Sequence, residues 1–481
     1  MKLFAPSAIA LALMAAFPAL AQSNAELLNE LKALRDRVNQ LEQRLNAQPA
    51  TAPAAPATPA AGQWGMTPEQ VRELNRVAIK AEGLQDSFTD QGFKGLKVTG
   101  QIDPTYIVNK RNKNASFVLL NNGDARYTYD NSYFGMAVID FAKETDSGTL
   151  WKLTLAPERG AGALTNGKSI VHEASVSVPL GDLQTRLWMG QIPDWTGYEL
   201  TLPAGNKFIT HNLLFDFMAP TAYTGAVMDV KSGKWWTRAG VANFNTARNT
   251  PGNSAPVAIY RVDYAKGEFS GFGFSGLHGK IPNFAADGSW QRDTGQVDPA
   301  TGDPIFEEAF FASAGKNTMA HLFELDAYFI RGDWSLFGQA SYGQQKDAAI
   351  FTSDGSLRNA RWWGLSGMMA YKITPRFEAL LRADYINNAK NGGGLLGYSF
   401  DDGINGIGRG VLADGSYAKG DSVGTNRYAL SMGMSYRVDE NATLKLEYRL
   451  DGASQPVFSN PDATRYSKTN HLLGASVVVS F

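Results

Sequence analysis

The chain of 481 residues lacks cysteine, lacks a clear excess of charge of either sign and lacks a long apolar run after its first residues. Without cysteine, no disulfide framework is available. The formal net charge is −1, and it becomes −2 if a leader that carries Lys2 is removed, so we expect no nucleic-acid partner. No later segment has the ~18 consecutive apolar residues of a membrane-spanning helix.

The first residues have the pattern of a secretory leader. Lys2 provides the charged start, Ile9–Phe17 provide the apolar stretch, and Ala19–Ala21 form an A-x-A cleavage site. A membrane helix is the alternative, but the run is short and ends in a processing signal. We therefore expect residues 1–21 to be a signal peptide. An exported chain without a spanning helix is destined for the periplasm, the outer membrane or the medium.

From about residue 93 to the last residue, short and long connections alternate along the chain. The short connections are Lys143–Ser147, Leu180–Asp182, Ser232–Lys234, Lys266–Glu268, Arg331–Asp333, Thr374–Pro375 and Asp439–Asn441. The predicted strands, about sixteen in number, are Lys94–Asn109, Ser132–Ala142, Gly148–Ala156, Ile170–Val178, Leu183–Gln191, Pro220–Lys231, Trp235–Phe244, Val257–Lys266, Glu268–His278, Ala320–Ile330, Asp333–Gly343, Arg361–Lys372, Arg376–Asn388, Thr425–Val438, Ala442–Asp451 and Asn470–Phe481. Tight turns at one end and long loops at the other predict an all-β, antiparallel outer-membrane barrel over residues 93–481.

The segment Leu444–Asp451 alternates strictly between apolar and charged residues. Leu444, Leu446, Tyr448 and Leu450 would face lipid, while Lys445, Glu447, Arg449 and Asp451 would face the lumen. Arg or Lys on the lipid face near the midplane costs about 2–4 kcal/mol, so this register is strongly preferred. A one-sided soluble sheet would alternate in the same way, but it would not explain the leader and the segregated loops. The last strand ends in Phe481. A final strand with a terminal Phe resembles the signal that the outer-membrane barrel assembly machinery recognises.

About sixteen strands leave a water-filled lumen, so we expect a pore. Basic residues slightly outnumber acidic ones at the inward positions, which favours a mild preference for anions. The pore-lining candidates are Lys97, Asp103, Asp140, Lys152, Arg186, Lys207, His211, Arg261, Asp263, Asp326, Arg382, Asp384, Arg427, Arg437, Lys445, Glu447 and Arg449. Alternatively, charged side chains inside a barrel form ion pairs with one another that only stabilise the wall.

The third long connection, Ile192–Ala219, is rich in aromatic residues. Exposed loops rarely contain so many, so we expect this one to fold inward against the wall and to narrow the pore. The alternative is a cap at a subunit interface.

An a/d heptad seam precedes the barrel. Its members, Leu27, Leu31, Leu34, Val38, Leu41 and Leu45, are spaced four and three residues apart in turn. Arg37 and Glu42, with Val38 and Leu41 between them, resemble a short trimerisation motif. We expect residues 22–47 to form a periplasmic coiled coil that holds a homotrimer, although a single amphipathic helix on some surface is an alternative.

Two further segments separate this stalk from the barrel. Residues 48–66 are rich in Ala and Pro and predict an extended linker. Residues 67–84 predict a short amphipathic helix, with Thr67 and Gln70 as a capping box and Gly83 at its end.

The segment from Gly95 to Thr224 resembles the OmpL-like outer-membrane porin family. The pieces that carry the resemblance are Leu96–Asp103, Met189–Pro193 with Gly197–Glu199, and Asn212–Phe215 with Ala219–Gly225. The whole chain is also similar to an uncharacterised group of β-proteobacterial porin-like proteins with a coiled coil before the barrel. The resemblance implies a Gram-negative outer-membrane location and supplies no catalytic residues.

We therefore expect a porin for small hydrophilic solutes, surrounded by outer-membrane lipid, with no enzymatic activity, cofactor or metal. The alternative is an envelope tether that binds peptidoglycan or another periplasmic partner through the coiled coil. A hydrolase at the barrel rim is a further alternative. The segment Gly271–Gly276 reads G-x-G-x-x-G, but it lies in a predicted strand with no helix after it, so a dinucleotide site is not expected.

Overall fold

In the computed structural model, the chain divides into two units, residues 1–87 and 88–481. The predicted signal peptide, coiled coil and linker, including the trimer residues Leu27, Leu31, Leu34, Arg37, Val38, Leu41, Glu42 and Leu45, lie outside the described residues. No helix in the described part is both long enough and apolar enough to cross a membrane. The structure describes residues 67–90, 92–111, 113–120, 134–157, 170–220, 222–244, 256–281, 283, 289–310, 317–349, 357–388, 424–462 and 464–481.

The helix α3 (Pro68–Asp90) belongs to the first unit except for its last three residues. The predicted capping box is present, because Gln70 N donates to Thr67 Oγ1 at 3.2 Å and Thr67 N donates to Gln70 Oε1 at 2.9 Å. The expected end at Gly83 is wrong, since the helix continues to Asp90. A glycine inside a helix costs only about 1 kcal/mol, and no proline follows before Asp90 to stop the helix.

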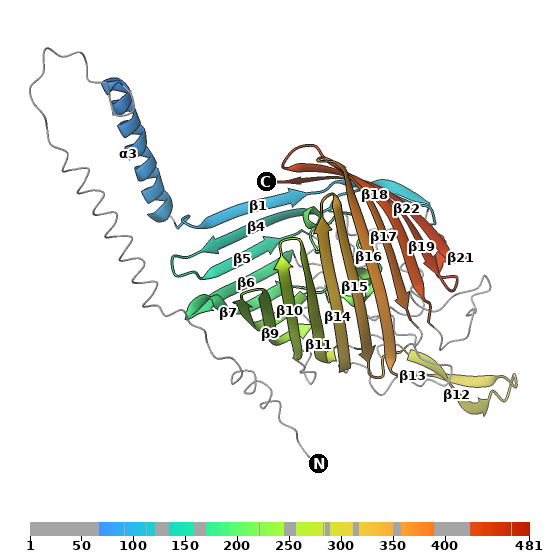
Figure 1. Ribbon diagram of the computed structural model, residues 1–481. Coiled ribbons are helices and arrows are strands. Elements are labelled where there is room, and N and C mark those ends of the chain that lie inside the picture. Colours follow the sequence, from blue (N-terminus) through green and yellow to red (C-terminus); the bar gives the residue numbers. More distant parts are fainter. Residues whose placement is uncertain are drawn as a thin grey trace, which may run out of the picture. The chain divides into compact units, whose positions relative to one another are not determined.

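The second unit is an antiparallel barrel (Figure 1). Its strands are β1 (Leu96–Ile102), β2 (Thr105–Asn109), β3 (Asn114–Val118), β4 (Ala137–Glu144), β5 (Leu150–Leu155), β6 (Val171–Leu180), β7 (Asp182–Pro193), β8 (Ala222–Ser232), β9 (Trp235–Phe244), β10 (Val257–Gly267), β11 (Ser270–Ile281), β14 (Thr318–Arg331), β15 (Trp334–Gln345), β16 (Ala360–Thr374), β17 (Phe377–Asn387), β18 (Arg427–Arg437), β19 (Ala442–Ala453) and β22 (Thr469–Ser480). Two small hairpins lie in the long connections: β12 (Ser289–Val297) with β13 (Pro304–Phe310), and β20 (Phe458–Ser459) with β21 (Tyr466–Ser467).

The sheet closes on itself because β22 pairs with β19 on one side and with β1 and β2 on the other. Its 18 segments occupy 16 strand positions, since β1 and β2 share one position and β3 and β4 share another. The prediction of an antiparallel barrel with about sixteen strands is therefore confirmed. The predicted short turns are also confirmed, and they lie at one end of the barrel.

The second predicted strand, Ser132–Ala142, is only partly right. The described residues pair with β2 as far as Val118 and with β1 from Ala137 onward. Asp103, in the break between β1 and β2, accepts hydrogen bonds from Gly135 N at 2.8 Å and Met136 N at 2.6 Å. A carboxylate in this position ties the returning chain to the wall.

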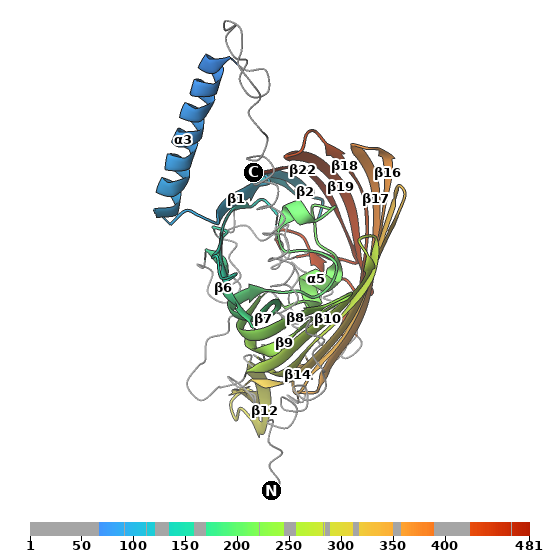
Figure 2. The ribbon, with the colours of Figure 1, turned by 60° about the vertical axis from the view of Figure 1, so that its left-hand side comes forward.

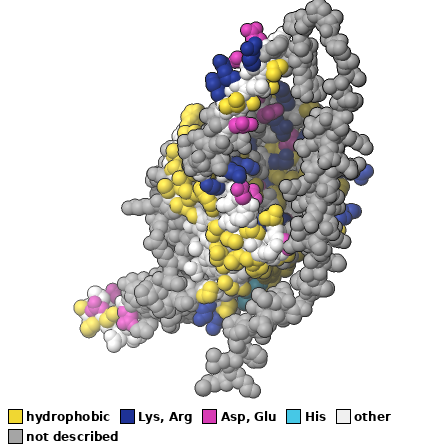
Figure 3. Space-filling view, turned by 90° about the vertical axis from the view of Figure 1, so that its left-hand side faces the viewer, with side chains coloured by type: hydrophobic (Ala, Val, Ile, Leu, Met, Phe, Trp, Pro, Cys, Tyr) yellow, Lys and Arg dark blue, Asp and Glu magenta, His cyan; other side chains and the backbone are white. Residues whose placement is uncertain are grey.

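Apolar side chains cover the outer surface and charged ones cover the inner surface, as the alternation in β19 predicts. Leu446 and Tyr448 are 46 % and 36 % exposed, whereas Glu447 and Arg449 are 3 % and 0 % exposed. On β18, Tyr428 and the alternate residues down to Tyr436 are likewise exposed. Figure 3 shows both hydrophobic and charged side chains on one face of the molecule. The apolar outer surface is typical of a wall that contacts lipid.

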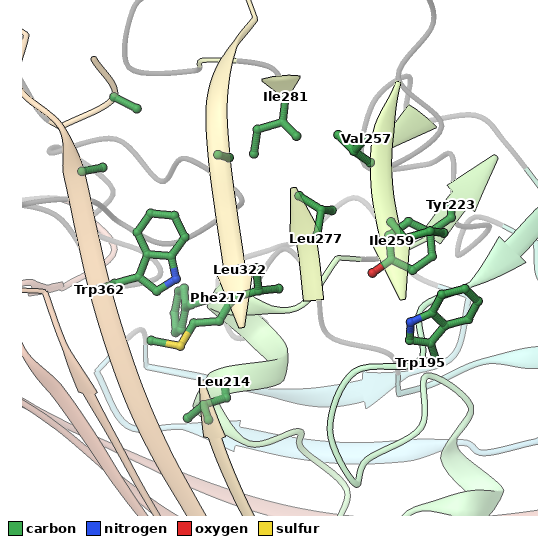
Figure 4. Packing of buried hydrophobic residues seen from close by; sticks show 14 of the residues in the cluster. Trp195, Leu214, Phe217, Tyr223, Val257, Ile259, Leu277, Ile281, Leu322 and Trp362 are labelled. Carbon is green, nitrogen blue, oxygen red and sulfur yellow. The ribbon is translucent and has the colours of Figure 1, made fainter. Parts of the chain in front are cut away.

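The largest hydrophobic cluster lies inside the barrel. Leu213, Leu214 and Phe217 from the connection between β7 and β8 pack there against inward side chains of β10, β11, β14 and β16, such as Ile259 and Trp362 (Figure 4). Figure 2 shows the short helix of this connection, α5 (Leu213–Met218), within the ring of strands. One side of the lumen is therefore filled by packed protein.

Candidate functional site: the lumen and its inward-folded loop

The connection of residues 194–220, which we call the lumen loop, folds inward against the wall, as its aromatic content predicts. Most of its residues are buried, and α5 contacts β15, β16, β17 and β18. These contacts place the loop against the inner wall on the far side from β7. The lumen loop is therefore a fixed part of the barrel interior and not an external cap.

Local hydrogen bonds explain how the loop folds. Asn206 Oδ1 accepts from Leu200 N at 2.8 Å and closes a tight bend around the short helix η3 (Pro203–Gly205). Asn212 caps α5, because its side chain accepts from Phe215 N at 2.8 Å. Asparagine is favoured in both roles since its short amide reaches nearby backbone N–H groups.

Arg382 on β17 is the main anchor of the loop. Its Nη1 lies 2.7 Å from Glu199 Oε1 and 2.8 Å from Thr210 O, and its Nη2 lies 3.0 Å from His211 O. Arg382 also lies 3.3 Å from Asp384 and 3.6 Å from Glu447. The guanidinium is fully buried, so its charge depends on these carboxylates and carbonyls for compensation.

A second arginine cluster lies beside α5. Arg449 Nη1 donates to His211 O at 2.7 Å and lies 3.8 Å from Asp216. Arg449 and Arg427 both pair with Asp451, at 3.0 Å and 3.1 Å. The guanidinium of Arg427 also stacks over Phe217 at 5.5 Å from the ring centroid. The helix of the loop is thus held to β18 and β19 by charge as well as by apolar packing.

β19 makes a third set of contacts with the backbone of the loop. Glu447 Oε2 accepts from Ile209 N at 2.9 Å and Thr210 N at 2.8 Å. Lys445 Nζ donates to Pro203 O at 2.8 Å. A carboxylate facing N–H groups and an ammonium facing carbonyls satisfy backbone groups that would otherwise be unpaired in a buried place.

The start of the loop is fixed to the opposite part of the wall. Arg261 on β10 donates to Trp195 O at 2.7 Å and pairs with Asp326 at 2.7 Å and Asp263 at 2.7 Å. The guanidinium of Arg238 lies over the Trp195 ring at 5.1 Å. The loop therefore contacts charged groups of the wall near both of its ends.

Two inward-facing glycines allow the loop to approach the wall closely. A Cβ on Gly364 of β16 would lie 3.0 Å from Leu214 and Met218, and one on Gly433 of β18 would lie 2.8 Å from Phe208. Both separations are shorter than ordinary van der Waals contact. Larger residues at these two positions would displace the loop.

Burial changes the acid–base behaviour of the loop. It raises the pKa of Asp194 to about 6, although hydrogen bonds from Thr196 favour the charged form. It also raises the pKa of Glu199 and Asp216, against the opposing attraction of Arg382 and Arg449. Burial lowers the pKa of His211 to about 3, and the hydrogen bond from its Nε2 to Leu200 O at 2.9 Å only partly offsets this effect.

The opposite side of the lumen, along β1 and β4–β7, keeps charged groups that solvent reaches. Lys97 on β1 is exposed, and Arg186 on β7 is half-buried. Lys152 on β5, with 36 % of its side chain exposed, pairs with Glu173 at 2.9 Å and lies 3.9 Å from Asp140. Arg186 donates to Ser177 Oγ at 2.7 Å and Gly148 O at 2.7 Å. These groups lie toward the turn end of the wall, whereas farther along the same strands the lumen loop touches the wall: Ala204 N donates to Gln101 Oε1 on β1 at 2.8 Å, and Phe215 packs against Val138 on β4.

The structure sorts the predicted pore-lining residues into three groups. Lys97, Lys152, Arg186 and Asp140 lie on β1 and β4–β7, and Lys207, which pairs with Glu378 at 2.7 Å, is partly exposed. Asp263 is also partly exposed and pairs with Arg238 and Arg261 at 2.7 Å. Arg437 is exposed at the end that carries the turns. The candidates that the loop covers are His211, Arg261, Asp326, Arg382, Asp384, Arg427, Lys445, Glu447 and Arg449.

Asp103 needs a separate correction, because it is 1 % exposed and binds backbone N–H groups of the wall, so it does not line an open pore. The sequence reasoning missed Glu173 and Glu378, which complete the ion pairs of Lys152 and Lys207. Alternation could have found both, since Glu173 shares the inward side of β6 with Ser175, and Glu378 shares that of β17 with Arg382.

Solved structures of bacterial outer-membrane proteins are similar in fold. The outer membrane channel DcaP of Acinetobacter baumannii is 12 % identical, covers 80 % of this chain and 97 % of its own, and has a TM-score of 0.48. The anion-selective porin from Comamonas acidovorans is 9 % identical, covers 80 % and 99 %, and has a TM-score of 0.46. The trimer form of OmpT, an outer membrane protein of Vibrio cholerae, is 11 % identical, covers 80 % and 99 %, and has a TM-score of 0.47.

No curated protein matches this sequence. One family model does match, and it spans the barrel together with the segments predicted to be a leader and a coiled coil. The OmpL-like resemblance of residues 95–224 stays a prediction beside that match. Since the model covers residues 2–481, the chain belongs to the family described as "Protein of unknown function (DUF3138)".

Proposed function

We propose that this protein is an outer-membrane channel through which small hydrophilic solutes diffuse. The observation that carries the proposal is a closed barrel of 16 strand positions, apolar outside and charged inside. A barrel of this size has a lumen that its own wall side chains do not fill, in contrast to one with about eight strands. The resemblance to the OmpL-like porins supports the same assignment and a Gram-negative outer-membrane location.

The solute path runs along β1 and β4–β7 on this proposal. The lumen loop covers the inner wall from β10 to β19, where Glu199 and Asp216 form buried ion pairs with Arg382 and Arg449. It also contacts β1 and β4 through Ala204 and Phe215. Charged groups that solvent reaches, such as Lys97 and Lys152, lie on β1 and β5, nearer the turns than these loop contacts. The loop therefore narrows the lumen and sets the cross-section that remains for solutes.

The proposed channel has a mild preference for anions. Lys97, Lys152 and Arg186 lie on β1, β5 and β7 along the proposed path, while the nearby carboxylates Asp140 and Glu173 are less exposed. Fixed positive charge near a pore raises the local concentration of anions. A Lys152→Glu variant in a salt gradient tests this point, because its reversal potential should shift toward cation selectivity while a Lys280→Glu change outside the lumen should not.

The proposed assembly is a homotrimer held by the coiled coil of residues 22–47 in the periplasm. The a/d seam and the motif that contains Arg37 and Glu42 support it. Residues 48–66 would act as an extended linker between the stalk and the barrel. Peptidoglycan is a candidate partner of the stalk.

Single-channel recording in planar bilayers tests the function directly. Purified, folded protein should insert and produce discrete conductance steps in simple salt solutions. A correctly folded barrel that inserts without producing any step would contradict the proposal. That result would favour an envelope tether that acts through the coiled coil.

A further inference from the structure

Positive side chains gather on the outer wall at the end of the barrel that carries the long loops. They come from neighbouring positions: Lys280 on β11, Lys346 directly after β15 and Arg361 on β16. His278 and His321 lie among them, with their Nδ1 atoms 3.1 Å apart. We call these five residues the outer cationic patch.

Strand register places the patch within a small area. Lys280 is opposite Met319, and Lys346 N donates to Met319 O at 2.8 Å. Arg361 is opposite Gln344, two residues before Lys346. Since neighbouring strands are about 4.8 Å apart, the three cations span roughly 15 Å across four strands.

The side chains of the patch point away from the lumen. Arg361 lies on the same face of β16 as Trp363, and His321 lies on the same face of β14 as Phe323, since each pair is two residues apart. Both aromatic residues are 40 % exposed on the outer surface. Lys280 shares its side of β11 with Phe274, which is 39 % exposed. Tyr260 donates to or accepts from His278 Nε2 at 3.2 Å. The patch therefore lies just beyond an aromatic girdle, where a barrel meets lipid headgroups.

No carboxylate on the described strands around the patch balances this charge at the outer surface. The acidic residues of β10, β11, β14, β15, β16 and β17 take inward positions, namely Asp263, Glu324, Asp326, Glu378 and Asp384. Asp347, 4.0 Å from Lys346, is the nearby acid among the described residues. At the opposite end of the same strands, Lys266 and Arg331 lie beside Glu268 and Asp333 in the turns. The outer surface of these strands therefore carries its excess of positive charge at the end of the barrel with the long loops.

We infer that the outer cationic patch binds the phosphate groups of a phosphorylated lipid in the outer leaflet. The inference rests on the outer-membrane location in the proposed function, but not on conduction. Lys and Arg side chains above an aromatic girdle are suited to phosphate oxygens, since they supply charge-assisted hydrogen bonds at headgroup level. The histidine pair adds polar groups beside them that carry no negative charge.

Native mass spectrometry of the folded, full-length protein in detergent tests this inference. The probes are doubly phosphorylated lipid A and its fully dephosphorylated form. The test variant carries Lys280→Gln, Lys346→Gln and Arg361→Gln, all at exposed positions. The matched control carries Lys234→Gln, Lys266→Gln and Arg331→Gln, which remove the same charge from the turn end.

The test variant should bind phosphorylated lipid A roughly tenfold more weakly than the wild type, or weaker still. The control should bind it like the wild type, and the dephosphorylated lipid should not distinguish the three proteins. Equal affinity of test variant and wild type would overturn the inference, as would an equal loss in the control. A barrel that binds lipid but does not conduct would contradict only the proposed channel function.

Discussion

Arg382 Nη1 on β17 lies 2.7 Å from Glu199 Oε1 in the lumen loop, and neither side chain is more than 4 % exposed. This contact joins the wall to a segment that lies 183 residues away in the sequence. Breaking a buried ion pair by removing one partner usually costs about 3–5 kcal/mol, because the other charge stays buried without compensation. The pair is therefore one of the contacts that hold the loop against the wall.

Replacing Arg382 with Met should release the lumen loop. Glu199, Asp384 and Glu447 would then repel one another without a cation between them. We expect larger single-channel conductance and faster hydrogen exchange in residues 199–212. Arg437→Met removes an exposed arginine from the neighbouring strand and serves as the control. Unchanged conductance and exchange in Arg382→Met would contradict the anchoring role.

Adding one methyl group at Gly433 should also loosen the loop. The new Cβ would lie 2.8 Å from Phe208 and 2.7 Å from Leu446 O, and overpacking of this kind costs about 1–3 kcal/mol. Gly367→Ala is the matched control, since its Cβ would meet no atom within 4 Å. The hydrogen-exchange rate of the α5 backbone amides, measured in both variants, shows how far each change loosens the loop. If the two variants exchange alike, the close approach at Gly433 is unimportant.

Acid should weaken the docking of the loop through His211. Its pKa is lowered to about 3 in the folded loop, so the released loop binds the proton more strongly. The contribution of neutral His211 to the free energy of loop docking is complete above about pH 6.5. Below that pH it falls by about 1.4 kcal/mol per pH unit until the pH reaches the pKa of His211 in the docked loop. Asp194 acts in the opposite direction, because its raised pKa of about 6 favours docking as the pH falls through that value.

Comparing His211→Gln with the wild type isolates the contribution of His211. Between pH 7 and pH 5, hydrogen exchange of residues 199–212, corrected for intrinsic rates, should accelerate more in the wild type than in the variant. His471→Gln on the outer wall is the control and should behave like the wild type. A wild-type response no larger than that of His211→Gln would contradict the assignment.

Charges in the a/d seam should weaken the proposed trimer without unfolding the barrel. Leu34→Asp with Leu41→Asp would place a carboxylate in the seam at two positions. Gln40→Asp changes the charge outside the seam and should leave the trimer intact. Native mass spectrometry reports the subunit number, and circular dichroism reports the barrel. A wild-type protein that is monomeric in detergent would contradict the trimer.

The barrel follows from sequence because its signals are local. The alternation in Leu444–Asp451, the short turns and the long loops each reflect a single closed wall that is apolar on its outer side and polar on its inner side. The break in the second strand does not follow in this way. It depends on Asp103, which binds N–H groups 32 and 33 residues further along the chain.

The candidate site was predictable only in part. Alternation identified inward residues such as Arg382 and Lys152, and aromatic content identified the inward loop. Which inward residues stay accessible depends on where the loop lies, and this depends on long-range contacts. Gly364 and Gly433 illustrate the limit, because a glycine on an inward position carries no sign of the side chain that packs over it.

The central claim is that solutes pass along β1 and β4–β7, beside the fixed lumen loop. The chain has no cysteine, so Lys152→Cys creates a single reactive thiol on the proposed path. In planar bilayers, a bulky methanethiosulfonate reagent should reduce the single-channel current of Lys152→Cys and leave Lys280→Cys, on the outer wall, unchanged. Lys152→Cys channels that conduct equally well after confirmed modification would contradict the path, and folded protein that never conducts would contradict the channel itself.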